Sequence, residues 1–273
     1  MRLAALLLVV AACSSDSSPS PTPSPTPSPT PSPSPNPSPT PPEPESPERP
    51  PLVSSRQLVL ATVDGWDGTL AELRRFERGD DGRWKQVGAP WQGIIGARGS
   101  AWGIGAHGDI PPRGDDGPVK KEGDGKSPAG VFSISAAYGY AATPPAGTRV
   151  PYHQVDKDWL CIDDKASRHY NEVLDTSGLE SDWSSHEDMR RDDDLYRWVL
   201  YLDHNPHATP GAGSCIFLHL WHGPDGGGTA GCTSMPRESM EALLAWLDPA
   251  AQPVFVLLPA AQAAALRAAW ALP

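Results

Sequence analysis

The fold and the chemistry of this chain turn on residues 216–232, IFLHLWHGPDGGGTAGC. The stretch opens as an apolar strand, and the strand period of two places His219 on the same face as Phe217 and opposite Leu218. A glycine-rich loop follows and ends at Cys232, and its glycines let the backbone turn tightly. A loop that returns from the end of a strand can bring a cysteine to a histidine, and a base near the sulfur activates it. The stretch therefore predicts a cysteine nucleophile that meets a histidine across an open cleft.

The rest of the chain predicts a mostly β domain with small peripheral helices. Apolar or alternating runs separated by Gly and Asp turns predict strands at residues 57–63, 69–78, 84–87, 93–95, 130–134, 198–203, 216–221 and 254–258. Apolar residues at helical spacing predict a helix over 236–247, and an alanine-rich run predicts another over 260–271.

The N-terminus indicates export. Residues 1–13 combine one arginine, a short apolar run and small residues before Cys13, which is typical of a signal peptide. The sequence Val10 to Cys13 resembles a bacterial lipobox, and this resemblance implies that Cys13 is lipidated. We expect a protein anchored to a membrane through this lipid and facing the periplasm or the cell wall. The alternative is a secreted protein that is cleaved elsewhere.

Residues 14–52 are rich in Pro, Ser and Thr and have too few apolar side chains to form a core. They predict a disordered tether, with or without a mechanical role, and residues 53–273 then form one domain. The net charge of −11 argues against a nucleic-acid partner.

Two further cysteines, Cys161 and Cys215, lie in strand-like sequence. Disulfides persist in exported proteins, so we expect these two to be bridged rather than to be buried free thiols.

Several motifs together resemble the L,D-transpeptidase catalytic domain of the YkuD type. They are KEGDGKSPAGVF at 121–132, Tyr170-Asn171, Asp203-His204-Asn205, IFLH at 216–219 and TAGCTSM at 229–235. The resemblance extends over nearly all of residues 57–259, and it rests on the order of the motifs rather than on any one of them.

The resemblance implies a β-sandwich or barrel that acts on the stem peptides of peptidoglycan without a cofactor or metal. It implies that Cys232 is the acyl-accepting nucleophile and that His219 is its general base. The backbone N–H groups around Gly231 and Cys232 would form the oxyanion hole. In the family the group that orients the histidine is often a backbone carbonyl, so no side chain is expected in this role.

The sequence departs from the family pattern in two places. Many members carry a histidine and a serine before the glycine, where this chain has Thr229 and Ala230. Many also carry an arginine two residues after the cysteine, where this chain has Ser234. The secondary substrate contacts of the family therefore cannot be transferred. His222 falls on the opposite face of a continuing strand from His219, which argues against a second base.

Three other functions remain open. Attack of water on the same acyl-enzyme would give an L,D-carboxypeptidase. Histidines and aspartates between 163 and 222 hold the atoms for a zinc-dependent wall peptidase, although no His-Glu-x-x-His helix is present. A lipid-anchored peptidoglycan-binding protein without activity is the third.

Overall fold

The computed structural model describes residues 50–108, 110–112 and 114–273. The expected signal peptide, Cys13 and nearly all of the expected tether lie outside the described residues. Leu52, at the end of the expected tether, is buried in the domain and its carbonyl accepts a hydrogen bond from Arg78. No helix in the described part of the chain has the length and apolar character that crossing a membrane requires.

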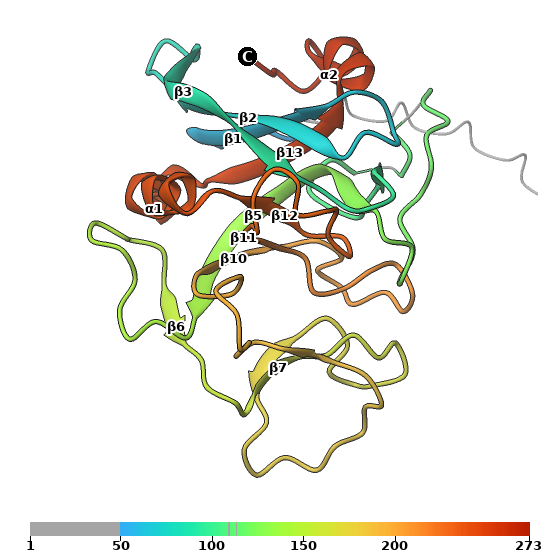
Figure 1. Cartoon of the computed structure of the whole chain (residues 1–273). Helices are drawn as coiled ribbons and strands as arrows, with labels where there is room; N and C mark the ends of the chain where they lie inside the picture. Colours follow the sequence, from blue (N-terminus) through green and yellow to red (C-terminus); the bar gives the residue numbers. More distant parts are fainter. Residues whose placement is uncertain (1–49, 109, 113) are drawn as a thin grey trace, which may run out of the picture. The chain divides into compact units, whose positions relative to one another are not determined.

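The domain is built on one large sheet that closes on itself (Figure 1). Its strand order is β10-β11-β12-β3-β2-β1-β13-β5-β4, and β10 also pairs with β5, so the path returns to its start. The strands are β1 (Gln57–Val63), β2 (Leu70–Arg78), β3 (Trp84–Ile94), β4 (Ser100–Trp102), β5 (Ser127–Gly139), β6 (Tyr152–Gln154), β10 (Val199–Leu202), β11 (Phe217–Leu220), β12 (Thr233–Met235) and β13 (Val254–Pro259). The prediction of a mostly β domain is confirmed.

Strand β3 runs through a segment where the sequence predicts a break. Residues 84–87 and 93–95 are predicted as separate strands, and Gly88 and Pro90 lie between them. In the structure the pairing of β3 with β2 shifts register between Leu73 and Arg75, opposite this interruption. A bulge of this kind accommodates residues that cannot join the ladder, so one long strand replaces two short ones.

Two small helices lie outside the sheet, as predicted. They are α1 (Arg237–Trp246) and α2 (Ala260–Leu266), and a 3-10 turn covers Pro249–Ala251. Helix α2 ends earlier than expected, and the chain after it turns so that Trp270 is buried.

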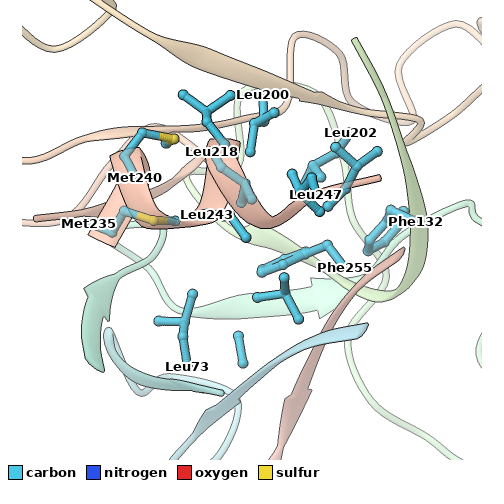
Figure 2. Close-up of a cluster of buried hydrophobic side chains, with 14 of the residues drawn as sticks. Leu73, Phe132, Leu200, Leu202, Leu218, Met235, Met240, Leu243, Leu247 and Phe255 are labelled. Carbon is cyan, nitrogen blue, oxygen red and sulfur yellow. The ribbon is translucent and has the colours of Figure 1, made fainter. Parts of the chain in front are cut away.

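The main core fills the space between the sheet and α1 (Figure 2). Leu218 of β11 and Phe255 of β13 belong to this core, α1 adds Met240 and Leu243, and Leu247 follows directly after the helix. Each fully buried side chain of this size contributes roughly 1.5–3 kcal/mol. The face of β11 opposite Leu218 is therefore the one that is free to build a site.

A separate sheet, which the sequence does not predict as such, lies in the segment 156–197, here called the cap. It consists of β8 (Val173–Asp175), β7 (Trp159–Cys161) and β9 (Glu187–Asp188), in that order. Figure 1 shows the β7 region of the cap in yellow, outside the main sheet. The cap matters because it supplies side chains to the site described next.

Candidate active site

Strands β11 and β12 bring Cys232 to the start of β11. The two strands are parallel neighbours, with Leu218 paired to Thr233, and the loop 221–231 carries the chain back between them. Cys232 immediately precedes β12 and therefore lies beside Phe217. The backbone N–H of Phe217 donates to the Cys232 Sγ at 3.3 Å. The return of the cysteine to the histidine-bearing strand is thus a consequence of sheet topology.

The expected alternation along β11 is present. Leu218 and Leu220 belong to the main core, whereas Phe217 packs in a second cluster that includes Cys232 and Tyr196. The His219 ring stands edge-on to the Tyr196 ring, with 5.2 Å between centroids. Cysteine and histidine thus share one aromatic neighbour on the same side of the strand.

The Cys232 thiol is enclosed by the protein and does not lie in an open cleft. The residue is 5% exposed, and its Sγ donates to the carbonyl of Cys215 at 3.5 Å. Burial raises the pKa of the thiol well above its ordinary value, and the charge of Glu187 acts in the same direction. The Phe217 N–H and the Tyr196 hydroxyl oppose this effect only in part. In this structure Cys232 is a neutral thiol.

His219 is held by the main chain. Its Nδ1 lies 2.6 Å from the carbonyl oxygen of Leu220, so Nδ1 carries the proton and donates. The group that orients the histidine is therefore a backbone carbonyl, as the resemblance implies. Burial lowers the pKa of His219 to about 4, with the Leu220 carbonyl acting in the opposite direction. A neutral imidazole with its Nε2 free of a proton can serve as a base.

His219 borders a cleft that is open to solvent and has a volume of about 340 Å³. This size lies in the range of pockets that bind small ligands and peptides. The cleft is lined by residues from the cap, from β3, β11 and β12, and from the glycine-rich loop, namely Ile94, Glu187, Arg191, Leu195, Tyr196, His219, Leu220, Trp221, His222, Gly223, Gly226, Gly227, Gly228, Thr229, Ala230 and Ser234. Cys232 does not line it, so the expectation of an open approach is met for the histidine and not for the thiol.

The expected oxyanion donors are only partly free. The N–H of Gly231 donates to the Thr229 Oγ1 at 3.2 Å. Among the described residues, the N–H of Cys232 has no acceptor. Thr229 also donates to the Cys232 carbonyl at 2.6 Å, and Ser127 donates to the same oxygen at 2.9 Å. Thr229, which replaces the usual family residue, thus fixes the loop that carries the nucleophile.

Two cap residues complete the site, and sequence reasoning missed both. The Tyr196 hydroxyl donates to the Glu187 Oε2 at 2.8 Å. Burial raises the pKa of Glu187 to about 7, although the Tyr196 bond favours the charged form. Neither residue lies in a recognisable motif, so the sequence carried no signal for them.

Arg191, the other charged residue of the cleft, is already paired. Its Nε and Nη2 contact Asp193 at 3.0 and 2.9 Å, and its guanidinium lies 5.2 Å from the Tyr196 ring centroid. The acidic run 192–194 is therefore in part a partner for this arginine.

Cys161 and Cys215 form a disulfide, as predicted. His222 borders the cleft but is exposed. Within the described part of the chain, no three His, Cys, Asp or Glu side chains gather in an arrangement that could hold a metal ion.

Comparison with known proteins agrees with the motifs. A family model described as the L,D-transpeptidase catalytic domain, YkuD, matches residues 103–256, which is more than half of the chain. The match includes the cap, His219 and Cys232. Comparison with curated proteins gave no significant match. Comparison with solved structures gave none either.

Proposed function

This chain belongs to the L,D-transpeptidase catalytic domain family, and we propose that it transfers the acyl group of a peptidoglycan stem peptide through a thioester on Cys232. The thiolate attacks the carbonyl that joins an L-centre to the terminal D-residue of the donor. His219 first takes the thiol proton and then gives it to the departing amine. An amine acceptor resolves the thioester.

The observation that carries the proposal is the shared environment of Cys232 and His219. Both lie on one side of β11 against Tyr196, and His219 presents a free Nε2 while Leu220 holds its Nδ1. The family match spans both residues. A sulfur and a neutral imidazole around one ring are the two parts that acyl transfer requires.

Activation of the thiol requires a change from the closed arrangement. Cys232 is covered, and Tyr196 belongs both to the cluster that holds the sulfur and to the lining of the cleft. We propose that the donor peptide displaces the Tyr196 ring as it enters the cleft. The displacement brings the thiol to the scissile carbonyl and lets its proton pass to His219.

The Cys232 N–H then donates to the developing oxyanion. An oxyanion donor of this kind is worth about 3 kcal/mol of transition-state stabilisation. The Gly231 N–H joins it only if its bond to Thr229 breaks.

Water can take the place of the amine because the cleft is open to solvent. The same residues then act as an L,D-carboxypeptidase. Export and lipidation at Cys13 complete the proposal, since peptidoglycan lies outside the cytoplasm, and Cys13→Ala should release the protein from the membrane fraction.

Mass spectrometry of the whole protein tests the chemistry. Incubation with a stem tetrapeptide or a carbapenem should add one acyl group to Cys232, and release of the terminal D-residue should accompany the peptide adduct. Cys232→Ala should form no adduct. His219→Gln should slow adduct formation by about 100-fold, the contribution typical of a general base.

His153→Gln is a suitable control, because His153 stacks on Tyr138 and does not line the cleft. This variant should react as the wild type does. A wild-type protein that stays unmodified, with Cys232 shown to be reduced, would refute the proposal. Tight binding of peptidoglycan without any adduct, equal in wild type and Cys232→Ala, would favour a non-catalytic binding protein instead.

A further inference from the structure

Glu187 lines the cleft that His219 borders, and it is the carboxylate of that cleft. It lies on β9 of the cap and is half-buried. Its Oε2 accepts the Tyr196 hydroxyl, whereas its Oε1 accepts no hydrogen bond from the described residues. Among those residues, Glu187 also forms no ion pair. One carboxylate oxygen is therefore available to a ligand.

The other charged group of the cleft, Arg191, forms no ion pair with Glu187 and offsets its charge only in part. Arg191 directs its Nε and Nη2 to Asp193. Glu187 is the one carboxylate among the cleft residues, so it gives this wall an unsatisfied negative charge. Removing a carboxylate from water without a paired cation is costly. The raised pKa of Glu187, caused by its burial, reflects this cost. A group kept at such a cost inside a cleft is a candidate for function.

The chemistry that fits this wall is a cationic amine. Acyl transfer to an acceptor needs such an amine, which is an ammonium ion at neutral pH and must lose a proton before it can attack. His219 returns its proton to the departing amine in the first half-reaction, so it is neutral again when the acceptor arrives. The acceptor still needs a group that holds its positive charge and removes its first proton.

We propose that Glu187 binds the ammonium group of the acceptor and takes its proton for the attack on the Cys232 thioester. This inference rests on the proposed function and adds the residue that makes transfer to an amine compete with transfer to water.

The proton balance of the step closes without another reactant. The acceptor ammonium gives one proton to the Glu187 carboxylate, and the free amine attacks the thioester carbon. His219 takes a second proton from the attacking nitrogen as the C–N bond forms. The C–S bond breaks, the Cys232 thiolate takes the proton from His219, and Glu187 releases its proton to solvent. The products are an amide, a thiol and one proton.

Glu187 should affect the two half-reactions in opposite directions. Its negative charge disfavours the Cys232 thiolate, so Glu187→Gln removes an obstacle to acylation. The same substitution removes the group that binds and deprotonates the acceptor. A residue needed only for folding would slow both steps together.

The test uses the full chain, a stem tetrapeptide as donor and D-methionine as acceptor at one fixed pH. The acyl-enzyme on Cys232 is followed by mass spectrometry, and the exchanged and hydrolysed peptides are quantified. Glu187→Gln should lower the ratio of exchange to hydrolysis by about 100-fold, while acylation is no slower than in the wild type. Glu187→Asp, which keeps the carboxylate, should recover part of the ratio.

Asp188→Asn is the matched control, because Asp188 is the neighbouring carboxylate of β9 and is exposed outside the cleft. It makes the same charge change and should leave the ratio unchanged. A wild-type ratio in Glu187→Gln, or an equal fall of acylation and exchange, would overturn the inference while leaving the proposed function in place. Failure of the wild type to form any acyl-enzyme would overturn both.

Discussion

The Cys161–Cys215 disulfide joins cap strand β7 to the backbone two residues before β11, with 5.9 Å between the two Cα atoms. The strand that carries His219 and the cap that carries Glu187 are thereby linked covalently. The disulfide also contacts the nucleophile, because the carbonyl of Cys215 accepts a hydrogen bond from the Cys232 thiol. The disulfide therefore holds the cap over the site as well as stabilising the domain.

Removal of this disulfide should destabilise the domain. The bridge closes a chain segment with a sequence separation of 54, and a loop of this length predicts a loss of about 4 kcal/mol in the free energy of unfolding. The double variant Cys161→Ser/Cys215→Ser avoids leaving an unpaired thiol. Urea unfolding measures the loss, and hydrogen exchange should increase first in residues 156–197. A double variant as stable as the wild type would show that the bridge does not constrain the chain.

A buried ion pair should have a comparable effect on stability. Lys120, whose side chain is 3% exposed, bonds the Asp124 Oδ1 at 2.6 Å. Asp124 also accepts the backbone N–H groups of Lys121 and Lys126, so it holds the turn of the 121–126 motif. Asp124→Ala leaves an ammonium buried without its partner and should lower the free energy of unfolding by about 3 kcal/mol. Urea unfolding provides the measurement.

The exposed pair Arg56–Asp80 is the control for this prediction, because the Asp80 side chain is 94% exposed. Solvent screens such a pair, so Asp80→Ala should cause no measurable change. Equal losses in the two variants would contradict the role given to burial.

Most of the main sheet could be predicted because each of its longer strands shows a pattern of apolar residues within its own sequence. The bounds of β1 agree with the predicted residues 57–63, and the alternation around His219 placed that residue correctly on β11. The pairing of Cys161 with Cys215 could also be predicted, since both lie in strand-like sequence of an expected exported protein.

The cap could not be predicted in the same way. Its strands are two or three residues long, too short for a period to appear, and their pairing depends on contacts between distant segments. Glu187 and Tyr196 meet His219 only because the cap folds back over β11. The burial of Cys232 follows from this same contact, which is why the sequence suggested an open thiol.

The stability of the domain should rise with pH between about 4.5 and 6.5. Burial lowers the pKa of His107, His204 and His219 to about 4 each. In this window the unfolded chain binds protons on these histidines and the native protein does not, so their contribution is complete above about 6.5 and is lost toward about 4. Glu187 acts with the opposite sign, because its pKa is raised to about 7, but it is one group against three.

Urea unfolding across this window tests the sign. His107 lies away from the cleft, and His107→Gln should reduce the slope of the free energy of unfolding by about 1.4 kcal/mol per pH unit, the value for one proton. A slope that is flat, or that falls with pH, would show that the histidines are not held neutral in the native state.

The enclosure of the nucleophile by the cap leads to a prediction that needs no substrate. Tyr196 belongs to the cluster that holds Cys232, stands edge-on to His219 and lines the cleft, so we expect its ring to cover the thiol from the cleft. Burial also keeps the thiol neutral, and only the thiolate reacts quickly with an alkylating reagent. Iodoacetamide should therefore label Cys232 slowly in the folded wild type. Tyr196→Ala should accelerate labelling by at least about tenfold, because it both uncovers and hydrates the sulfur.

Tyr196→Phe distinguishes the effect of the aromatic ring from the effect of its hydroxyl. It keeps the aromatic cover and loses the hydroxyl, which bonds Glu187 and favours the Cys232 thiolate, so labelling should remain slow. Labelling is read by mass spectrometry at Cys232, with circular dichroism confirming that each variant is folded. Rapid labelling of the folded wild type would mean that the cap is already displaced in solution and that no opening step precedes acylation. Equal acceleration of labelling in Tyr196→Phe and in Tyr196→Ala would instead show that the hydroxyl and its bond to Glu187 keep Cys232 covered. That bond would then be the contact that holds the cap closed over the thiol.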